Sequence, residues 1–257
     1  MAETIALIKD KLKAAAARGD NEEIRSLLAY YGQDERAGVK SACAACEKKL
    51  EELKKERERL EVMRRYEHEY EHLGLVCGID EAGRGPLAGP VVAGAVILPK
   101  DTEILWLNDS KQLSEKKREE LYDEIMDKAV AVGVGIVGNA RIDEINILQA
   151  DYEAMCEAIG SLAVMPQVLL NDAVTIPQVT IPQVPIIKGD AKSVSIAAAS
   201  VIAKVTRDRI MKEYDDLMPE YGFARHKGYG SAAHIEAIRK YGPSPIHRMT
   251  FLKNILS

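Results

Sequence analysis

The chain has 257 residues, of which 47% are hydrophobic and 29% charged, and its formal net charge is −5. This composition is that of a globular protein, and no apolar run approaches the roughly 20 residues that a membrane helix needs. The N-terminal segment lacks the basic start and apolar core of a secretory signal, and four scattered cysteines do not form a disulfide framework, so we expect a cytoplasmic protein without membrane contact.

Residues 1–72 are predicted to form a helical extension, because they contain no proline and no β-branched run. One helix is expected to begin at Asp20, whose following acids suit a first helical turn. From Ala37 to Glu71, leucines spaced among Glu, Lys and Arg predict one long helix. Its charges are balanced, with 15 basic and 16 acidic residues in 1–72. The extension therefore either binds substrate through paired basic residues or is a solvated arm.

The α/β part of the chain begins with Cys77–Pro99, which contains the first candidate site. Two apolar runs flank a Gly-Arg-Gly turn at 83–85, and this pattern predicts strand, turn and strand. Asp80 and Glu81 stand where the first strand meets the turn. Adjacent carboxylates suit a hard divalent cation, and glycines let backbone N–H groups approach a phosphate or sugar. The alternative is an ordinary hairpin with two solvated acids.

The following elements alternate between helices and strands, as in an α/β domain. Ser114 is a predicted N-cap for a helix that runs to Lys128. A strand is expected at 130–137 and a helix at 142–163. A short buried strand then begins at Val168 and ends at Asn171-Asp172.

Residues 174–187 hold a tandem repeat, TIPQV at 175–179 and again at 180–184. Because proline cannot donate to a sheet ladder, the repeated prolines exclude a central strand. We expect a surface excursion between two strands. GDAKS at 189–193 then opens a long helix with its core at 194–210.

The C-terminal segment is locally basic, although the whole chain is acidic. Residues 221–257 carry six Lys or Arg and one acid, which suits contact with a polyanion. The segment also contains His226, His234 and His247, but no nucleophile elbow that would make a Ser/His hydrolase. We expect His226 and His247 to be surface residues.

Four acids occupy informative positions: Asp80 and Glu81 at a strand–turn junction, Asp172 at a strand end and Asp190 at a helix start. In open α/β sheets, ligands bind at strand ends. Clustered carboxylates repel one another unless a cation compensates. Convergence of the four would therefore imply bound Mg²⁺ or Mn²⁺, and two such ions can stabilise both oxygens of an in-line phosphoryl displacement.

Several motifs in combination make the chain resemble bacterial ribonuclease HII. They are GIDEAGRGPLAGPVVAGAVILP at 78–99, DSKQLSEKKREELYDEI at 109–125, IDEINILQADYEAM at 142–155, GDAKSVSIAAASVIAKVTRDR at 189–209, HKGYGS at 226–231 and KYGPSPIHR at 240–248. The resemblance covers 74–257. It implies an α/β, ribonuclease H-like fold, in which a five-stranded mixed sheet is flanked by helices, as a catalytic domain at 73–257 behind the helical extension at 1–72.

The resemblance also implies an activity. The expected enzyme is a metal-dependent endoribonuclease that hydrolyses the RNA strand of RNA/DNA hybrids. It is also expected to cut DNA duplexes on the 5′ side of single embedded ribonucleotides, leaving 3′-hydroxyl and 5′-phosphate ends. Two divalent ions, Mn²⁺ or Mg²⁺, are the implied cofactors, and a monomer is the expected state. The alternatives are a ribonuclease HIII-like hybrid nuclease, whose turn usually lacks Gly-Arg-Gly, and a non-catalytic hybrid-binding protein.

Matched position by position, the resemblance implies three groups of site residues. Asp80, Glu81, Asp172 and Asp190 match the catalytic metal-binding acids, with Asp109 and Asp151 as competitors for the place of Asp172. Gly83, Arg84 and Gly85 match the turn that senses the ribose 2′-hydroxyl, Tyr229 matches an aromatic residue that stacks on a sugar, and Lys111, Lys192 and Ser193 look like phosphate contacts.

Overall fold

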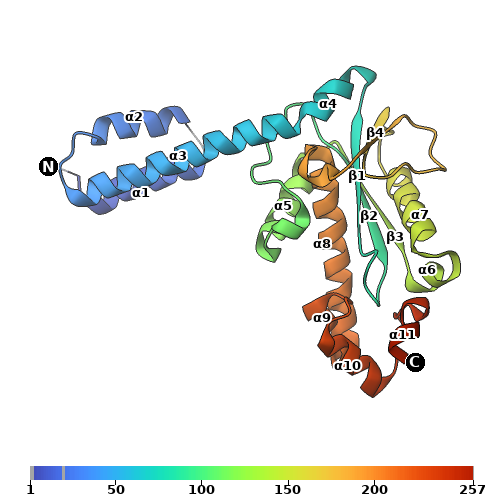
Figure 1. Cartoon of the computed structure of the whole chain (residues 1–257). Helices are drawn as coiled ribbons and strands as arrows, with labels where there is room; N and C mark the ends of the chain where they lie inside the picture. Colours follow the sequence, from blue (N-terminus) through green and yellow to red (C-terminus); the bar gives the residue numbers. More distant parts are fainter. Residues whose placement is uncertain (1–2, 19–20, 257) are drawn as a thin grey trace. The chain divides into compact units, whose positions relative to one another are not determined.

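The computed structural model describes residues 3–18 and 21–256 (Figure 1). The chain divides into two compact units, with the boundary between Glu61 and Val62. Asp20, where a helix was expected to begin, lies outside the described residues.

The first unit is helical, as predicted for the N-terminal extension. It contains α1 (Ile5–Arg18), α2 (Asn21–Tyr31) and α3 (Ala37–Met63), whose buried faces include Ile8, Leu12, Ile24, Val39 and the free cysteines Cys43 and Cys46. The prediction of a single helix from 37 to 71 is wrong in the length of that helix. It ends at Met63, and α4 (Arg65–Tyr70) and the 3₁₀ helix η1 (Glu71–Leu73) follow in the second unit.

The second unit is built on a five-stranded mixed sheet, which confirms the predicted fold class. Its strands are β1 (Val76–Ala82), β2 (Val91–Ile97), β3 (Ala131–Val137), β4 (Val168–Asp172) and β5 (Gln183–Ile186). Their order in the sheet is β3-β2-β1-β4-β5. β1 pairs antiparallel with β2 and parallel with β4. The C-terminal ends of β1 and β4 therefore lie side by side at the same end of the sheet.

Two helices cover the two faces of this sheet (Figure 1). α8 (Val194–Leu217) packs on β1 and β2, and α7 (Ile147–Gly160) packs on β2 and β3. Both helices lie so close to the strands that a side chain would clash with their backbone. A Cβ at Gly94 would lie 2.5 Å from the carbonyl oxygen of Ala199 on α8, and one at Gly135 would lie 1.9 Å from that of Ala154 on α7. Small residues in the strands therefore permit the tight helix–sheet packing that surrounds the site.

The helix expected from 142 to 163 is interrupted, which corrects the prediction. α6 (Asn139–Ile145) and α7 meet at Asn146, whose φ of 69° places it in the left-handed region. The side chain of Asn146 accepts hydrogen bonds from the N–H groups of Leu148 and Gln149 at 3.0 and 3.2 Å. Asn tolerates this conformation and is a good N-cap, so one residue both ends α6 and begins α7.

The repeated segment is less exposed than expected. Ile176 is fully buried, and the side chain of Gln183 accepts a hydrogen bond from the Ile176 N–H at 2.8 Å and donates to the Ile176 oxygen at 2.9 Å. The second copy of TIPQV therefore fastens the first against the core. β5 includes Pro185 and lies at the edge of the sheet, where proline is tolerated.

The remaining elements are short, apart from α5 (Glu115–Lys128), which packs against α8 and is capped by Ser114 as predicted. The 3₁₀ helices η2 (Ser110–Gln112) and η3 (Gly189–Ala191) precede α5 and α8. The C-terminal segment contains η4 (Pro219–Tyr221), α9 (Phe223–His226), α10 (Ala232–Tyr241), η5 (Met249–Phe251) and α11 (Lys253–Leu256). In the part of the chain that the structure describes, no helix has the length and apolarity to cross a membrane.

Candidate active site

Three elements of the second unit bring the four predicted acids together. Asp80 and Glu81 lie on β1, and Asp172 ends the neighbouring parallel strand β4. Asp190 lies in η3, and the preceding Gly189 donates its N–H to Oδ1 of Asp172 at 2.6 Å. The four acids therefore lie near the C-terminal ends of β1 and β4, which is the convergence that would imply a bound cation.

Burial and mutual repulsion raise the pKa values in this cluster. Asp80 is 4% exposed, and burial, followed by the charges of Glu81 and Asp172, raises its pKa well above the ordinary value. Burial also raises the pKa of Glu81, partly offset by Arg84. For Asp190 the causes of a raised pKa are burial, then the charge of Asp109 and then that of Asp172. The charge of Asp172 thus contributes to the raised pKa of all three other acids.

The two competing acids, Asp109 and Asp151, lie near the cluster. Asp151 is fully buried on α7, and its Oδ2 lies 3.5 Å from Nε of Arg84. Burial, with the charge of Glu81, raises the pKa of Asp151 to about 8, and neither of its oxygens accepts a hydrogen bond from the described residues. Asp109 caps η2 and acts on Asp190. Among the four acids, the charge of Asp151 is therefore coupled to Glu81, and that of Asp109 to Asp190.

The three predicted phosphate contacts fall into two groups. Lys111 and Lys192 are exposed; burial lowers the pKa of Lys111, but nearby acids outweigh it and raise that pKa overall. Ser193 is fully buried and caps α8 by accepting a hydrogen bond from the Ile196 N–H at 3.2 Å. Its hydroxyl also donates to Oε1 of Glu67. To donate its hydroxyl to a phosphate, Ser193 would have to give up its hydrogen bond to Glu67.

The Gly-Arg-Gly turn and Tyr229 lie beside each other. A Cβ at Gly85 would be 3.7 Å from a ring carbon of Tyr229, whose side chain is 47% exposed. Gly83 has a φ of +101°, and a Cβ there would lie 2.2 Å from the side chain of Arg207, so only glycine suits this position. The predicted 2′-hydroxyl sensor and the predicted sugar platform therefore face the same region.

Two buried arginines, which the sequence did not single out, support this turn. Arg207 and Arg248 are each no more than 1% exposed, and every hydrogen bond of their guanidinium groups goes to a backbone carbonyl. Together they hold residues 83–90 against the C-terminal segment. The acceptors of Arg207 are Ala88, Pro90 and Lys227 at 2.9–3.0 Å, and those of Arg248 are Gly83, Arg84 and Gly89 at 2.6–3.0 Å.

Two hydrogen-bonded histidines, His234 and His247, bind the backbone of Tyr229. Both are buried, which corrects the expectation that His247 is a surface residue. His247 is 1% exposed and His234 is fully buried. The N–H of Ser244 donates to Nδ1 of His247 at 2.8 Å, and Nε2 of His247 lies 3.0 Å from Nε2 of His234. Nδ1 of His234 lies 2.9 Å from the carbonyl oxygen of Tyr229.

This arrangement fixes both tautomers. Because Nδ1 of His247 is an acceptor, its proton is on Nε2 and is donated to His234. His234 then carries its proton on Nδ1 and donates it to the carbonyl of Tyr229. His226, by comparison, is half-buried and stacks on His234 with ring centroids 4.3 Å apart.

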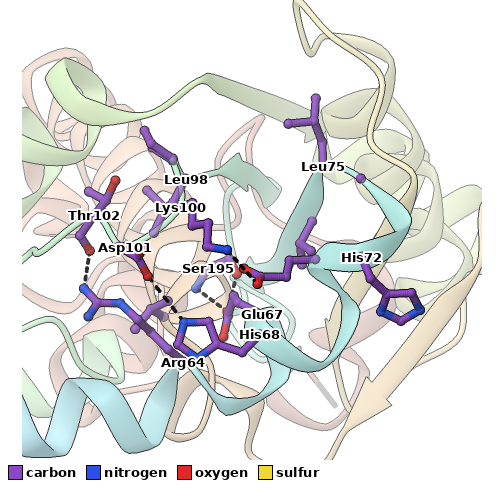
Figure 2. A pocket seen from close by; sticks show the side chains of 15 residues that line it. Arg64, Glu67, His68, His72, Leu75, Leu98, Lys100, Asp101, Thr102 and Ser195 are labelled. Atoms are coloured by element: carbon purple, nitrogen blue, oxygen red, sulfur yellow. Dashed lines mark hydrogen bonds and ion pairs between the residues drawn. The ribbon is translucent and has the colours of Figure 1, made fainter.

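An open pocket of the second unit lies away from the carboxylates. It is bounded by α4, η1, the loop after β2 and the start of α8 (Figure 2). Lys100 and Glu71 form an ion pair at 2.9 Å on its wall. None of the four acids lines this pocket, which sits at the N-terminal end of β1, whereas Asp80 and Glu81 lie towards the other end.

The donors at the carboxylate cluster fit a hard divalent cation by their chemistry, because all of them are carboxylate oxygens. The pKa values of Asp80, Glu81 and Asp190 are raised first by burial and then by neighbouring acids, and a bound cation would offset that repulsion. Within residues 3–18 and 21–256, no three His, Cys, Asp or Glu side chains are already spaced as a metal site. Cations would therefore have to draw the carboxylates together.

Comparison with known proteins points to one family. The model of the ribonuclease HII family matches residues 77–254, and that of the ribonuclease HII N-terminal domain matches residues 4–71. The ribonuclease HII of Lachnoclostridium phytofermentans is 66% identical over 227 residues, which are 88% of this chain and 89% of that protein.

Solved structures share the fold of the second unit. The ribonuclease H2 of Pyrococcus horikoshii OT3 matches with a TM-score of 0.60 and 32% identity, covering 70% of this chain and 96% of that one. The crystal structure of Bst-RNase HIII in complex with Mn²⁺ matches with a TM-score of 0.54 and 18% identity, covering 71% of this chain and 69% of that one. At this lower identity the similarity concerns the fold alone.

Proposed function

Because the chain belongs to the ribonuclease HII family, we propose that it cuts DNA duplexes on the 5′ side of single embedded ribonucleotides as well as the RNA strand of RNA/DNA hybrids. Membership makes it a ribonuclease H hydrolase that depends on divalent metal, so the non-catalytic alternative is set aside. The proposed products are 3′-hydroxyl and 5′-phosphate ends. We also propose that it acts as a cytoplasmic monomer.

The observation that carries this proposal is the convergence of four acids from β1, β4 and η3 at one end of the sheet. Asp80, Glu81, Asp172 and Asp190 would hold two Mn²⁺ or Mg²⁺ ions, which would supply charge stabilisation for the attacking and leaving oxygens of the phosphodiester. The charge of Asp172 acts on Asp80, Glu81 and Asp190 alike, which supports its choice over Asp109 and Asp151.

The exposed basic residues complete the phosphate-binding side. Lys111 is charged and faces the same acids, so it can offset their repulsion and contact a phosphate beside the scissile bond. Lys192 is exposed two residues after Asp190 and can bind the next phosphate. In the proposed complex Ser193 contributes mainly by capping α8, the helix that begins beside these groups.

Recognition of ribose is assigned to Gly83, Arg84, Gly85 and Tyr229. Phosphates cannot distinguish RNA from DNA, because both backbones carry the same charge. The turn can offer backbone groups to the 2′-hydroxyl, and the Tyr229 ring can lie against the next sugar. A deoxyribose leaves room for the ring, so cleavage is favoured where DNA follows a ribonucleotide.

The residues of the first unit are proposed to raise substrate affinity. Their basic pairs, such as Lys48-Lys49 and Lys54-Lys55, are exposed on α3, and the ion pairs at these lysines are no shorter than 3.7 Å. Weak exposed ion pairs of this kind exchange readily for phosphates.

The test is to separate binding from cleavage with Asp80→Asn. The change removes a charged ligand but keeps the side-chain shape, so we expect cleavage of a hybrid to be lost while its affinity in an electrophoretic shift assay stays within about 2-fold. Asp127→Asn, an exposed acid on α5, is the matched control and should cleave like the wild type. Normal turnover by Asp80→Asn would contradict the proposed metal site.

A further inference from the structure

Glu67 of α4 makes a contact that joins the start of the second unit to the segment after Asp190. Its Oε1 accepts hydrogen bonds from the backbone N–H of Ser195 at 3.0 Å and from the Ser195 hydroxyl (Figure 2). The same oxygen also accepts a hydrogen bond from the Ser193 hydroxyl. More than 120 residues separate these partners in sequence. Its other oxygen, Oε2, is buried and accepts no hydrogen bond from the described residues.

Apolar contacts hold α4 in the same place. Tyr66 and Tyr70 pack against a buried cluster of Leu170 on β4, Ile186 on β5 and Ile196 on α8. Because α4 packs against the sheet in this way, it holds the Glu67 carboxylate at the first turn of α8. A negative charge and a hydrogen-bond acceptor are both favourable at a helix N-terminus.

The segment that Glu67 holds is directly connected to the carboxylate cluster. Ser193 donates its backbone N–H to the oxygen of Gly189 at 2.9 Å, closing the η3 turn that carries Asp190. The N–H of the same Gly189 binds Asp172. On the other side, Ser195 lies against β1 at Gly78, where a Cβ would be 2.0 Å from the Ser195 carbonyl carbon.

We propose that Glu67 is a positioning residue of the active site, which sets the place of the η3 turn and thereby of Asp190 and Asp172 relative to Asp80. This inference rests on the proposed function of the acids as metal ligands. It also means that α4, although it lies within the predicted extension at 1–72, is part of the catalytic unit.

No other group among the described residues replaces the carboxylate for the three donors if Glu67 is shortened to Ala. Ser193 and Ser195 are each at most 1% exposed. Water from the open pocket that Glu67 and Ser195 line can reach the vacated place, but it is not anchored to α4 as the carboxylate is. The first turn of α8 would then be free to shift away from β1. A displacement of this kind by about 1 Å is enough to cost roughly 100-fold in rate.

The experiment uses the full-length protein with Glu67→Ala, Glu67→Gln and Glu67→Asp. Glu71→Ala is the matched control, because Glu71 follows on the same segment but pairs with the exposed Lys100. Two quantities are measured: kcat and KM on an RNA/DNA hybrid, and the affinity for Mn²⁺ by electron paramagnetic resonance without substrate. Circular dichroism establishes that each variant is folded.

For Glu67→Ala we expect kcat to fall about 10- to 100-fold with KM within about 2-fold, and Mn²⁺ affinity to weaken about 10-fold. Glu67→Gln keeps an acceptor oxygen and should recover most of both losses, and Glu71→Ala should match the wild type. If Glu67→Ala does not fold, Glu67→Asp decides, with an expected loss of Mn²⁺ affinity of several-fold because its oxygen is withdrawn by one methylene.

Wild-type kcat and Mn²⁺ affinity in a folded Glu67→Ala protein, or in Glu67→Asp if that variant is needed, would overturn the inference even if the melting temperature fell. The substrate-free measurement separates the two proposals. If the wild-type chain bound Mn²⁺ but did not cut hybrids, the proposed function would fail, while a weaker Mn²⁺ affinity of Glu67→Ala would still support the role of Glu67.

Discussion

The buried pair His234 and His247 predicts a specific loss of stability in mild acid. Both imidazoles are neutral in the fold, and each nitrogen of the pair already has an assigned role in the chain from Ser244 to Tyr229. A proton added to Nδ1 of His247 would point at the Ser244 N–H, so that two donors would face each other. A proton added to Nε2 of His234 would likewise point at the Nε2 proton of His247. Protonation of either ring therefore breaks a buried hydrogen bond.

The magnitude follows from the two pKa values. Burial, then the neighbouring imidazoles, lowers the pKa of His247 from 6.5 to about 4, and burial lowers the pKa of His234 to about 4 as well. One such shift corresponds to about 3.4 kcal/mol. In the unfolded chain both groups take up protons near pH 6.5, so this stability is complete above pH 6.5 and is lost progressively as the pH falls towards 4.

The assay is urea unfolding from pH 7.5 to pH 5, followed by the fluorescence of Trp106, the only tryptophan, which lies in the second unit. The wild type is compared with the double variant His234→Gln/His247→Gln. The carboxylates titrate in both proteins, so the difference between them reports the two histidines. We expect the stability advantage of the wild type to shrink by about 2–4 kcal/mol over this range. His72→Gln, at an exposed position, is the control and should run parallel to the wild type. An advantage that does not change with pH would refute the reasoning.

Three further predictions concern the site and the first unit. Asp172→Asn should abolish hybrid cleavage, because the charge of Asp172 acts on all three other acids, while Asp109→Asn and Asp151→Asn retain more activity; equal rates for the three would refute this order. Tyr229→Ala should lose about 1–3 kcal/mol of transition-state binding on a single embedded ribonucleotide, measured as kcat/KM, and Tyr229→Phe should keep most of it, because stacking needs the ring; equal damage would make the phenolic oxygen the working group. Deleting residues 1–61 should leave a folded nuclease with a raised KM that depends on salt, and an unchanged KM at several salt concentrations would support a solvated arm.

Much of the fold was predictable because its determinants are local. Apolar runs and glycine turns marked β1, β2 and β4, and Ser114 marked the start of α5. The four acids could be proposed from the sequence because they stand near strand ends and before a long helix, and because they match the motifs of the resemblance. Asn146 was missed, although Asn is one of the few residues that accept its positive φ, because the apolar spacing continues on both sides of it.

The residues that support the site were not predictable, because their roles depend on partners distant in sequence. Arg207 and Arg248 look like ordinary surface cations until the fold surrounds them with carbonyl groups. Glu67 lies in a strongly charged helical stretch, where nothing distinguishes a buried cap from a solvated acid. His247 was expected at the surface because it stands in a basic segment, whereas the fold buries it with its Nε2 against His234.

We propose above all that the enzyme uses four metal-binding acids and a ribose-sensing turn to cut a DNA duplex at a single embedded ribonucleotide. This proposal is tested most directly by mapping the products from a DNA duplex that contains one ribonucleotide, with Mg²⁺, with Mn²⁺ and with a chelator. We predict one cut on the 5′ side of the ribonucleotide, with 3′-hydroxyl and 5′-phosphate ends, in either metal and none in the chelator. Cleavage only within longer RNA stretches, or cleavage that persists in the chelator, would contradict the account.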